Sequence, residues 1–379
     1  MIKMNNCHLC NQKLFSKPVI ELKGVPKTAQ YYPEKSEFAK DTGITLIIWQ
    51  CSGCGLVQHK MKPVDYYKEV ITAATLSEKS RLSRLNQMKV FVKKFGLDGK
   101  KVLDIGTGKG EMVDVLKEAG FMTAGIEAAE KSVRIGRSAG RNIIRGYIGD
   151  FKKIEGSPYD AFVSLNYLEH LPSPGVIIRN IYNNIVADGV GFITVPNLDY
   201  LLETNSFYEF VADHISYFTA KTFTHAFEAN GFDVLECWRI NEDNDIAAFV
   251  RKRPSLNLLP NYTKVEALIK NIQEIIAEYK TKGKRIAVWG AGHRTLALLA
   301  LSKADDISYI IDSAKFKQGK FTPILHTKIV PPDYLRKNRV DLVIVMVPGF
   351  YSSEVLEMLN NMNIAVVMVV RDNKIKIFK

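Results

Sequence analysis

Apolar residues in the middle of the chain follow two alternating spacings, one typical of buried strands and one typical of helices that bury a single face. In residues 82–95 the apolar side chains recur every three or four positions, with lysines and arginines opposite, which predicts an amphipathic helix. Short apolar runs predict strands over 101–105, 121–127, 159–165 and 191–196. Because helical patterns separate these runs, we expect a largely parallel α/β sheet with its ligand site at the carboxyl ends of the strands.

Two of the separating helices have clear limits in the sequence. One follows residue 110 and is stopped by Gly120, and the other runs from Gly175 to Val186 ahead of an Asp188-Gly189 turn.

The last third of the chain repeats the alternation. After a linker at 251–261, Thr263 and Glu266 have the spacing of a capping box and predict the start of a long helix. Strands are predicted over 284–289, 307–312, 342–348 and 365–370, and a Gly-Ala-Gly turn follows the first of them. This pattern predicts a second Rossmann-like sheet, with a scaffold domain that binds no ligand as the alternative.

One stretch concentrates the candidate chemistry. Residues 104–110 (Asp-Ile-Gly-Thr-Gly-Lys-Gly) place an acid at the end of a strand and three glycines at every second position, ahead of a helix. The glycines let the backbone approach a ligand that a Cβ would block, and the helix N-terminus then points at that ligand. An ordinary βα turn is the alternative.

Glu127 ends the next predicted strand, about 20 residues beyond the glycines, in the usual place of a ribose-binding acid. There a carboxylate can accept hydrogen bonds from both ribose hydroxyls of a nucleoside. A solvated surface acid is the alternative reading of Glu127.

Four of the five cysteines form two Cys-x-x-Cys pairs, Cys7 with Cys10 and Cys51 with Cys54. Two such pairs supply four thiolates, which complete a tetrahedral structural zinc site with no open position. Disulfides are the weaker alternative because thiols stay reduced in the cytoplasm, and a redox or metal-free role is also open. We therefore expect an N-terminal zinc-binding domain that performs no chemistry itself.

Length and charge narrow the class of protein. The 379 residues exceed one typical core, and we expect three domains, at 1–75, 76–252 and 253–379. No apolar run approaches the ~20 residues of a membrane helix, and the N-terminus lacks the apolar core of a signal peptide, so we expect a cytoplasmic protein without a membrane partner. The net charge of +12 favours acidic partners, but the lysines are scattered, which favours a small anionic substrate over nucleic acid.

The motifs of the middle domain together resemble the class I S-adenosylmethionine-dependent methyltransferases. The resemblance rests on the stretch 104–110, the strand-end Glu127 and residues 166–172 (Asn-Tyr-Leu-Glu-His-Leu-Pro), whereas a nicotinamide enzyme normally shows Gly-x-Gly-x-x-Gly. It implies a Rossmann-like core with S-adenosylmethionine as methyl donor. The residues that it assigns to the cofactor are Asp104, Gly106, Thr107, Gly108, Gly110, Glu127, Asp150, Phe151, Asn166, Tyr167 and His170.

Over nearly its full length the chain resembles a narrower group, the three-domain sugar C-methyltransferases of deoxysugar biosynthesis. The two cysteine pairs, the methyltransferase core, the acid-His-x-x-Tyr-Phe stretch at 213–218 and the Gly-Ala-Gly turn carry this resemblance. It implies a nucleotide-linked keto sugar as substrate and a terminal domain that helps to hold the nucleotide. The family's Glu-His pair, with histidine as general base, maps onto Asp213 and His214. The chain differs from the family in this aspartate and at 241–244 (Asn-Glu-Asp-Asn), where the family has a His-Gly-Gly loop.

The resulting hypothesis is C-methylation through an enolate by a monomer or weak homodimer. His214 would remove the proton beside the keto group, and Asp213 would orient the substrate or the imidazole; a structural histidine is the alternative role for His214. O- or N-methylation of a sugar or related polar metabolite in cell-surface polysaccharide or natural-product biosynthesis stays open, as does nucleotide-sugar binding without catalysis. RNA methylation has no supporting motif.

Overall fold

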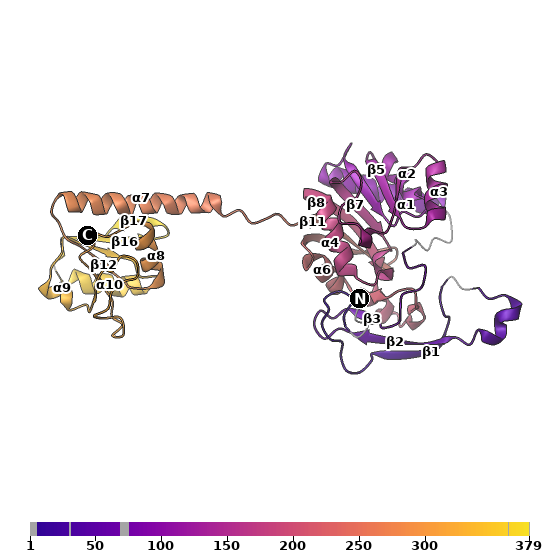
Figure 1. The fold of residues 1–379 in the computed structure, drawn as a ribbon, viewed down its shortest axis with the longest axis horizontal. Coiled ribbons are helices and arrows are strands. Elements are labelled where there is room, and N and C mark those ends of the chain that lie inside the picture. The colour runs from indigo at the N-terminus through magenta and orange to yellow at the C-terminus, as the bar shows by residue number, and fades with distance from the viewer. Residues whose placement is uncertain (1–5, 30–31, 69–75, 363, 379) are drawn as a thin grey trace. The chain divides into compact units, whose positions relative to one another are not determined.

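The structure, a computed structural model, describes residues 6–29, 32–68, 76–362 and 364–378 (Figure 1). The chain divides into two units, Met1–Pro254 and Ser255–Lys379, and we describe each by itself. The first unit contains both the cysteine pairs and the glycine-rich turn, and the expected division of this unit at residue 75 stays a prediction.

An antiparallel sheet joins the N-terminal segment to a much later part of the chain. Its strands are β1 (Ile20–Val25), β2 (Ile44–Gln50), β3 (Val57–His59) and β9 (Ser216–Tyr217), and a short 3-10 helix, η1 (Lys35–Lys40), lies between the first two. Val57 pairs with Tyr217 and Gln58 with Ser216. Main-chain hydrogen bonds therefore hold the N-terminal segment against the stretch that contains His214.

The central sheet of the first unit has the strand order β10-β11-β8-β7-β4-β5-β6. Its strands are β4 (Lys101–Ile105), β5 (Met122–Glu127), β6 (Ile143–Arg145), β7 (Tyr159–Leu165), β8 (Ile185–Pro196), β10 (Phe232–Ile240) and β11 (Asp245–Lys252). The pairs from β8 to β6 are parallel, and the pairs of β11 with β8 and with β10 are antiparallel. The expected largely parallel α/β sheet is confirmed.

Helices cover both faces of this sheet (Figure 1). They are α1 (Glu78–Phe95), α2 (Glu111–Glu118), α3 (Glu130–Ser138), α4 (Pro174–Asn184), α5 (Leu198–Glu203) and α6 (Ala220–Glu228), with the 3-10 turns η2 (Ile148–Asp150), η3 (Leu168–His170) and η4 (Phe207–Glu209). Successive side chains of a strand point to opposite faces. Accordingly, Ala161 and Val163 pack with α1 and α2, whereas Phe162 packs with α4 and α6.

The sequence prediction for α4 and β8 is wrong in detail. The helix ends at Asn184 rather than Val186, and the strand begins at Ile185 because Ile185 already pairs with Tyr159 of β7. Asp188 lies inside the strand span with φ of 61°, at the point where the register between β7 and β8 shifts. The Asp-Gly signal therefore marks an irregularity within a strand rather than a separate turn.

The second unit is built on a sheet with the order β14-β13-β12-β15-β16-β17, in which only the β16–β17 pair is antiparallel. Its elements are α7 (Leu259–Thr281), β12 (Ile286–Trp289), α8 (His293–Leu301), β13 (Tyr309–Ile311), β14 (Ile329–Val330), α9 (Tyr334–Lys337), β15 (Leu342–Val345), α10 (Tyr351–Asn360), β16 (Val366–Arg371) and β17 (Lys374–Ile377). The predicted second Rossmann-like sheet is confirmed.

The predicted start of the long helix is wrong. Helix α7 begins at Leu259, with Pro260 in its first turn, where the missing N–H of proline costs nothing. Thr263 therefore lies inside the helix, and its Oγ1 donates to the carbonyl oxygen of Leu259 at 3.1 Å instead of capping. No helix in the described parts of the chain is long and apolar enough to span a membrane.

An aromatic cluster between α1 and the central sheet allows a test of this fold. Phe91 of α1 is fully buried, and its ring stacks on Phe249 with centroids 5.4 Å apart, close to Phe192 and Phe121. Phe91→Ala should lower the free energy of unfolding by about 3–5 kcal/mol because it leaves a cavity in this core. Urea denaturation measures the loss. Val90→Ala is the matched control, since this neighbouring side chain is 58% exposed; an equal loss in both variants would contradict the packing described.

Candidate active site

The glycine turn lies where the central sheet meets helix α2. Gly106, Gly108 and Gly110 have φ of 73, 57 and 83°, and α2 starts at Glu111. This left-handed region is costly for residues with a Cβ. A Cβ on Gly106 would also lie 2.8 Å from the ring of Tyr167. The turn is thus both left-handed and covered by an aromatic ring, so glycine is required at Gly106.

Two buried acids stand at the strand ends beside this turn. Asp104 accepts a hydrogen bond from Thr107 Oγ1 at 2.5 Å, and Glu127 accepts from the backbone N–H groups of Gly108 at 2.9 Å and Ala129 at 2.7 Å. Burial, together with the charge of Glu127, raises the pKa of Asp104 to about 7. A carboxylate oxygen can accept more than one hydrogen bond, so Glu127 keeps capacity for a ligand hydroxyl. A glycine turn with a buried acid at the neighbouring strand end is the arrangement that nucleoside-binding sheets use.

Asp150 is the last residue of η2 and Phe151 follows it, beyond the end of β6. The Asp150 carboxylate is exposed and lies 3.3 Å from Lys68 Nζ. The Phe151 ring packs against Gly146, where an added Cβ would lie 2.1 Å from it. Their expected contact with adenine stays a prediction.

Asn166, Tyr167 and His170 follow β7 and connect the glycine turn to a cavity. Asn166 has φ of 46°, and its Nδ2 donates to Asp245 Oδ1 at 2.9 Å. The Tyr167 hydroxyl donates to the carbonyl oxygen of Lys68 at 3.0 Å. His170 Nδ1 donates to the carbonyl oxygen of Asp213 at 2.9 Å. This segment therefore contacts both the N-terminal segment and the stretch around His214.

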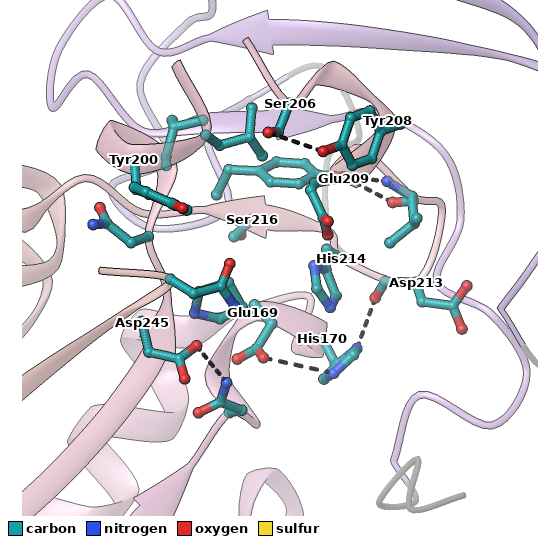
Figure 2. A pocket seen from close by; sticks show the side chains of 18 of the residues that line it. Glu169, His170, Tyr200, Ser206, Tyr208, Glu209, Asp213, His214, Ser216 and Asp245 are labelled. Atoms are coloured by element: carbon teal, nitrogen blue, oxygen red, sulfur yellow. Dashed lines mark hydrogen bonds and ion pairs between the residues drawn. The ribbon is translucent and has the colours of Figure 1, made fainter. Parts of the chain in front are cut away.

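A cavity of about 540 Å³, called here the His214 cavity, lies beside this segment (Figure 2). His214 lines it, with its ring centroid 4.8 Å from that of His170. Burial, with the neighbouring His170 and His59, lowers the pKa of His214 to about 3. His214 is therefore a neutral imidazole at pH 7 and can accept a proton.

Asp213 lies next to His214 in sequence, but its carboxylate contacts other groups. Oδ1 accepts a hydrogen bond from the Tyr66 hydroxyl at 2.6 Å, and Oδ2 accepts from the backbone N–H of Ala29 at 2.7 Å. The side chain is 1% exposed. These bonds tie the N-terminal segment to the cavity wall, and the expected direct role of Asp213 toward substrate or imidazole stays a prediction.

Sequence reasoning missed two acids of this cavity. Glu169 is buried between two predicted residues of its own motif, Tyr167 and His170. Asp245 begins β11 and accepts from Asn166. The motif at 166–172 was the available signal for Glu169; for Asp245 no local pattern indicates the contact.

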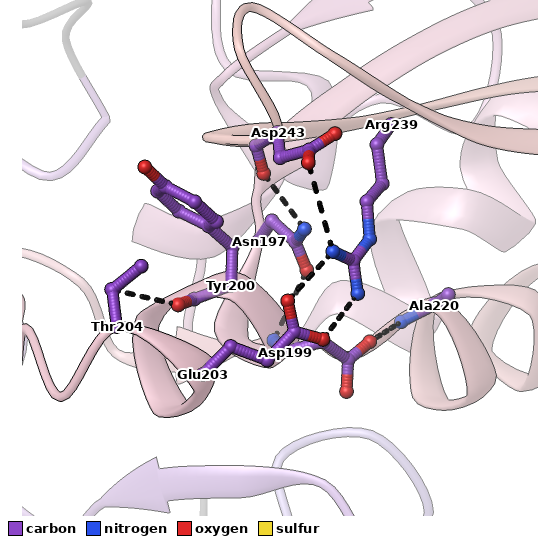
Figure 3. Close-up of polar contacts among 8 residues, drawn as sticks. All are labelled: Asn197, Asp199, Tyr200, Glu203, Thr204, Ala220, Arg239 and Asp243. Atoms are coloured by element: carbon purple, nitrogen blue, oxygen red, sulfur yellow. Dashed lines mark hydrogen bonds and ion pairs between the residues drawn. The ribbon is translucent and has the colours of Figure 1, made fainter.

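Another part of the cavity wall, at the start of α5, is held by a polar cluster (Figure 3). Asn197 caps this helix by accepting from the N–H of Asp199 at 3.0 Å, and its Nδ2 donates to the carbonyl oxygen of Asp243 at 2.8 Å. Arg239 donates to both carboxylate oxygens of Glu203, at 2.6 and 2.8 Å. These contacts hold the 241–244 turn against the cavity.

The four predicted metal-binding cysteines come together in the N-terminal segment. The sulfur atoms of Cys7 and Cys54 are 3.5 Å apart, as are those of Cys10 and Cys51, and all four lie within 4.8 Å of one another. A disulfide would bring two sulfurs to about 2.05 Å. Thiolates at about 2.3 Å from a zinc ion lie about 3.8 Å apart. The cluster therefore fits one tetrahedral zinc ion.

The second unit has its own cavity, of about 580 Å³, at the carboxyl ends of β12, β13 and β15. Gly290, Asp312 and Lys317 line it. Asp312 follows β13 as predicted, and it accepts from the N–H of Ala291 at 2.8 Å and from Lys317 Nζ at 2.9 Å.

Comparisons with known proteins agree with this geometry. Residues 80–237 match the family model of a methyltransferase domain. The chain carries a class I methyltransferase domain of the S-adenosylmethionine-dependent kind. Residues 256–368 match a second family model, a C-methyltransferase C-terminal domain.

Curated relatives match only part of this chain. A ubiquinone biosynthesis O-methyltransferase of Idiomarina loihiensis is 34% identical over 90 residues, which are 22% of this chain and 37% of that protein. One of Pseudomonas aeruginosa is 30% identical over 131 residues, 32% of this chain and 56% of that protein. The chain thus spans less than two thirds of the length of these relatives.

Solved structures similar to the chain include a methyltransferase. The magnesium protoporphyrin IX methyltransferase of Synechocystis with bound SAH is 14% identical, with a TM-score of 0.39 over 50% of this chain and 97% of that chain. A protein of Pyrococcus horikoshii is also 14% identical, with a TM-score of 0.41 over 50% of this chain and 99% of that chain.

The glycine turn yields a test of cofactor binding. Gly106→Ala should weaken binding of S-adenosylhomocysteine at least tenfold, because alanine disfavours the left-handed φ and its Cβ meets the Tyr167 ring. Isothermal titration calorimetry measures the affinity. Gly292→Ala in the second unit is the matched control, since that φ is −83° and nothing lies within 4 Å of the added Cβ. Unchanged affinity in a folded Gly106→Ala protein would show that the turn does not hold the cofactor.

The polar cluster at α5 allows a test of which contacts stabilise the wall of the His214 cavity. Asn197→Ala removes the helix cap and the bond to the 241–244 turn, so it should lower the free energy of unfolding by about 1–2 kcal/mol. Chemical denaturation measures this loss. Thr204→Ala, at the exposed end of the same helix, serves as control and should change stability by less than about 0.5 kcal/mol.

Proposed function

We propose that this protein is an S-adenosylmethionine-dependent C-methyltransferase that acts on the carbon beside the keto group of a nucleotide-linked deoxysugar. The observation that carries the proposal is the position of His214. It is a neutral imidazole in a 540 Å³ cavity, and His170 and Asn166 line that cavity while belonging to the segment next to the glycine turn. The match of residues 256–368 to a C-methyltransferase C-terminal domain supports C-methylation.

The cofactor fits the first unit at the glycine turn. We assign Gly106, Gly108 and Gly110 to close backbone approach and Glu127 to the ribose hydroxyls, with Asp104 holding Thr107 in the turn. When bound, S-adenosylmethionine supplies a methyl group made electrophilic by its cationic sulfur. The buried acids beside the turn favour that positive charge.

In the proposed reaction His214 removes the proton from the carbon next to the keto group. The carbon left with the electron pair would take the methyl group, and the sulfur would keep the electron pair of the broken S–CH3 bond. The proton would stay on the imidazole of His214 until it leaves to solvent. A histidine whose pKa is about 3 is a weak base in the free protein. Proton removal therefore depends on the negative charge that develops on the substrate, which stabilises the neighbouring imidazolium.

Asp213 is assigned a positioning role in this proposal. Its carboxylate holds Tyr66 and Ala29, and its carbonyl oxygen accepts from His170. Because His214 follows it directly, Asp213 fixes the backbone from which the base projects.

The second unit supports a nucleotide-linked substrate. Its 580 Å³ cavity lies at strand ends in a Rossmann-like sheet, and His293, Arg294 and Lys317 are among its lining residues. Basic side chains near a glycine turn suit the phosphates of a nucleotide. The net charge of +12 agrees with an anionic substrate.

O- or N-methylation of a sugar or related polar metabolite is the second candidate. The partial relatives are O-methyltransferases, and the 241–244 turn replaces a loop of the sugar C-methyltransferases. Product analysis separates the two, because a methyl group labelled with carbon-13 gives different NMR shifts on carbon, oxygen and nitrogen.

Replacement of the base provides the main test. His214→Ala and His214→Asn should reduce turnover by roughly 10²–10⁴-fold, while their affinity for S-adenosylhomocysteine should equal that of the wild-type protein. In deuterium oxide without the methyl donor, the original protein should also exchange the hydrogen beside the keto group, and both variants should not. The substrates are a panel of nucleotide-linked 4-keto sugars.

His225→Ala, a change at an exposed histidine of α6, is the control and should leave both rates unchanged. Turnover and exchange that persist in His214→Ala with normal cofactor binding would refute the base assignment.

A further inference from the structure

Three metal-ligating side chains converge in the wall of the His214 cavity. They are Glu169 and His170 of η3 and His214, which precedes β9 (Figure 2). One donor atom from each lies within 4.8 Å of the other two. Two imidazoles with one carboxylate are a ligand set for a divalent transition metal such as Zn²⁺ or Fe²⁺, whereas Mg²⁺ and Ca²⁺ prefer oxygen ligands.

Glu169 carries a second, independent sign of a missing ligand. Its side chain is 2% exposed, and Oε2 is buried without a hydrogen-bond partner among the described residues. Its other oxygen lies 3.7 Å from His170 Nε2, which is longer than a hydrogen bond. A buried carboxylate oxygen without a partner is costly, and a cation bound there would remove that cost.

His170 is oriented as a metal ligand requires. Its Nδ1 donates to the carbonyl oxygen of Asp213 at 2.9 Å, which leaves Nε2 facing Glu169. Histidine ligands usually make such a bond with the ring nitrogen that does not bind the metal, because it fixes the tautomer and the ring plane.

The charge of the cavity also favours a cation. Four acids line it, namely Glu169, Glu209, Asp213 and Asp245, and no lysine or arginine is among the described lining residues. A cation entering this cavity therefore meets carboxylates and neutral donors and no competing positive side chain within the lining.

We propose that Glu169, His170 and His214 form a binding site for a divalent transition-metal cation, separate from the four-cysteine cluster. Metal–nitrogen and metal–oxygen bonds of about 2.0–2.2 Å would draw the most distant donors together by roughly an ångström, which side-chain rotation can supply. The ion binds the lone pair of His214 that the proposed reaction uses. Bound metal and the general base therefore exclude each other, so the ion inhibits methyl transfer; this last consequence rests on the proposed function.

The stoichiometry of bound zinc tests the site directly. Protein without a polyhistidine tag is dialysed against micromolar Zn²⁺. The number of zinc ions per chain is then measured by inductively coupled plasma mass spectrometry. The original protein should hold two ions per chain, one of them in the four-cysteine cluster. Glu169→Gln and His170→Gln should each hold one, with affinity for the second ion at least tenfold lower. His225→Gln is the control and should hold two.

Cobalt gives a readout that distinguishes the sites. Co²⁺ bound by thiolates shows intense sulfur-to-metal charge-transfer absorption, whereas Co²⁺ held by Glu169 and two histidines should show only weak visible bands, absent in Glu169→Gln. One ion per chain in the original protein, or a second ion that persists unchanged in Glu169→Gln and His170→Gln, would overturn the proposal.

The proposed function and the metal site can fail separately. In the original protein, Zn²⁺ should inhibit both methyl transfer and hydrogen exchange at the concentration at which the second ion binds. If His214→Ala keeps full activity while the second ion binds to the original protein, the base assignment fails and the metal site stands. If His214 is required but no second ion binds, the metal site fails and the base assignment stands.

Discussion

The geometry of the cavity depends on how the stretch from Asp213 to Tyr217 is held. Its first residue binds the N-terminal segment through Tyr66 and Ala29, and its last two pair with β3. The carbonyl oxygen of Asp213 fixes His170, so one short stretch positions both histidines of the cavity. These contacts come from distant parts of the chain. His214 is therefore positioned only when the antiparallel sheet of β1, β2, β3 and β9 is folded against the central sheet.

The cysteine cluster and the glycine turn also depend on contacts with other parts of the first unit. Cys7 and Cys51 are buried in the hydrophobic cluster that includes helices α4 and α6, so a metal that stabilises the cysteine pairs also stabilises this face of the sheet. At the other end, Tyr167 covers Gly106 and donates to the carbonyl oxygen of Lys68. The N-terminal segment thus contacts both the wall of the cavity and the residue that covers the glycine turn. A structural metal far from the chemistry can therefore influence the site through packing alone.

Local patterns predicted the parts of the structure that local physics determines. Buried parallel strands are apolar throughout, and the turn at Gly106 needs glycine, so the spacing predicts the sheet, the glycine turn and the position of Glu127 at the end of β5. The bond between Tyr66 and Asp213 joins residues 147 positions apart, and no periodicity encodes it. The start of α7 was misplaced because Pro260 can end a linker or begin a helix equally well. The missed residues, Glu169 above all, are defined by what surrounds them in space rather than by their neighbours in sequence.

Charge balance in the His214 cavity limits which chemistry it can support. Asp213 and Asp245 are held by neutral donors, and burial raises the pKa of Glu169 to about 8. An anion formed from a substrate here therefore finds no lysine or arginine among the described lining residues to stabilise it. In the proposed reaction the compensating charges are the sulfonium of the methyl donor and the imidazolium of His214. Transfer of the methyl group from the sulfonium to the carbanion would break the S–CH3 bond and leave a neutral thioether and a methylated carbon. A site of low dielectric constant favours a reaction that removes a pair of opposite charges. This balance also explains why a metal ion would act as an inhibitor, since it brings positive charge to the cavity but removes the base that creates the anion.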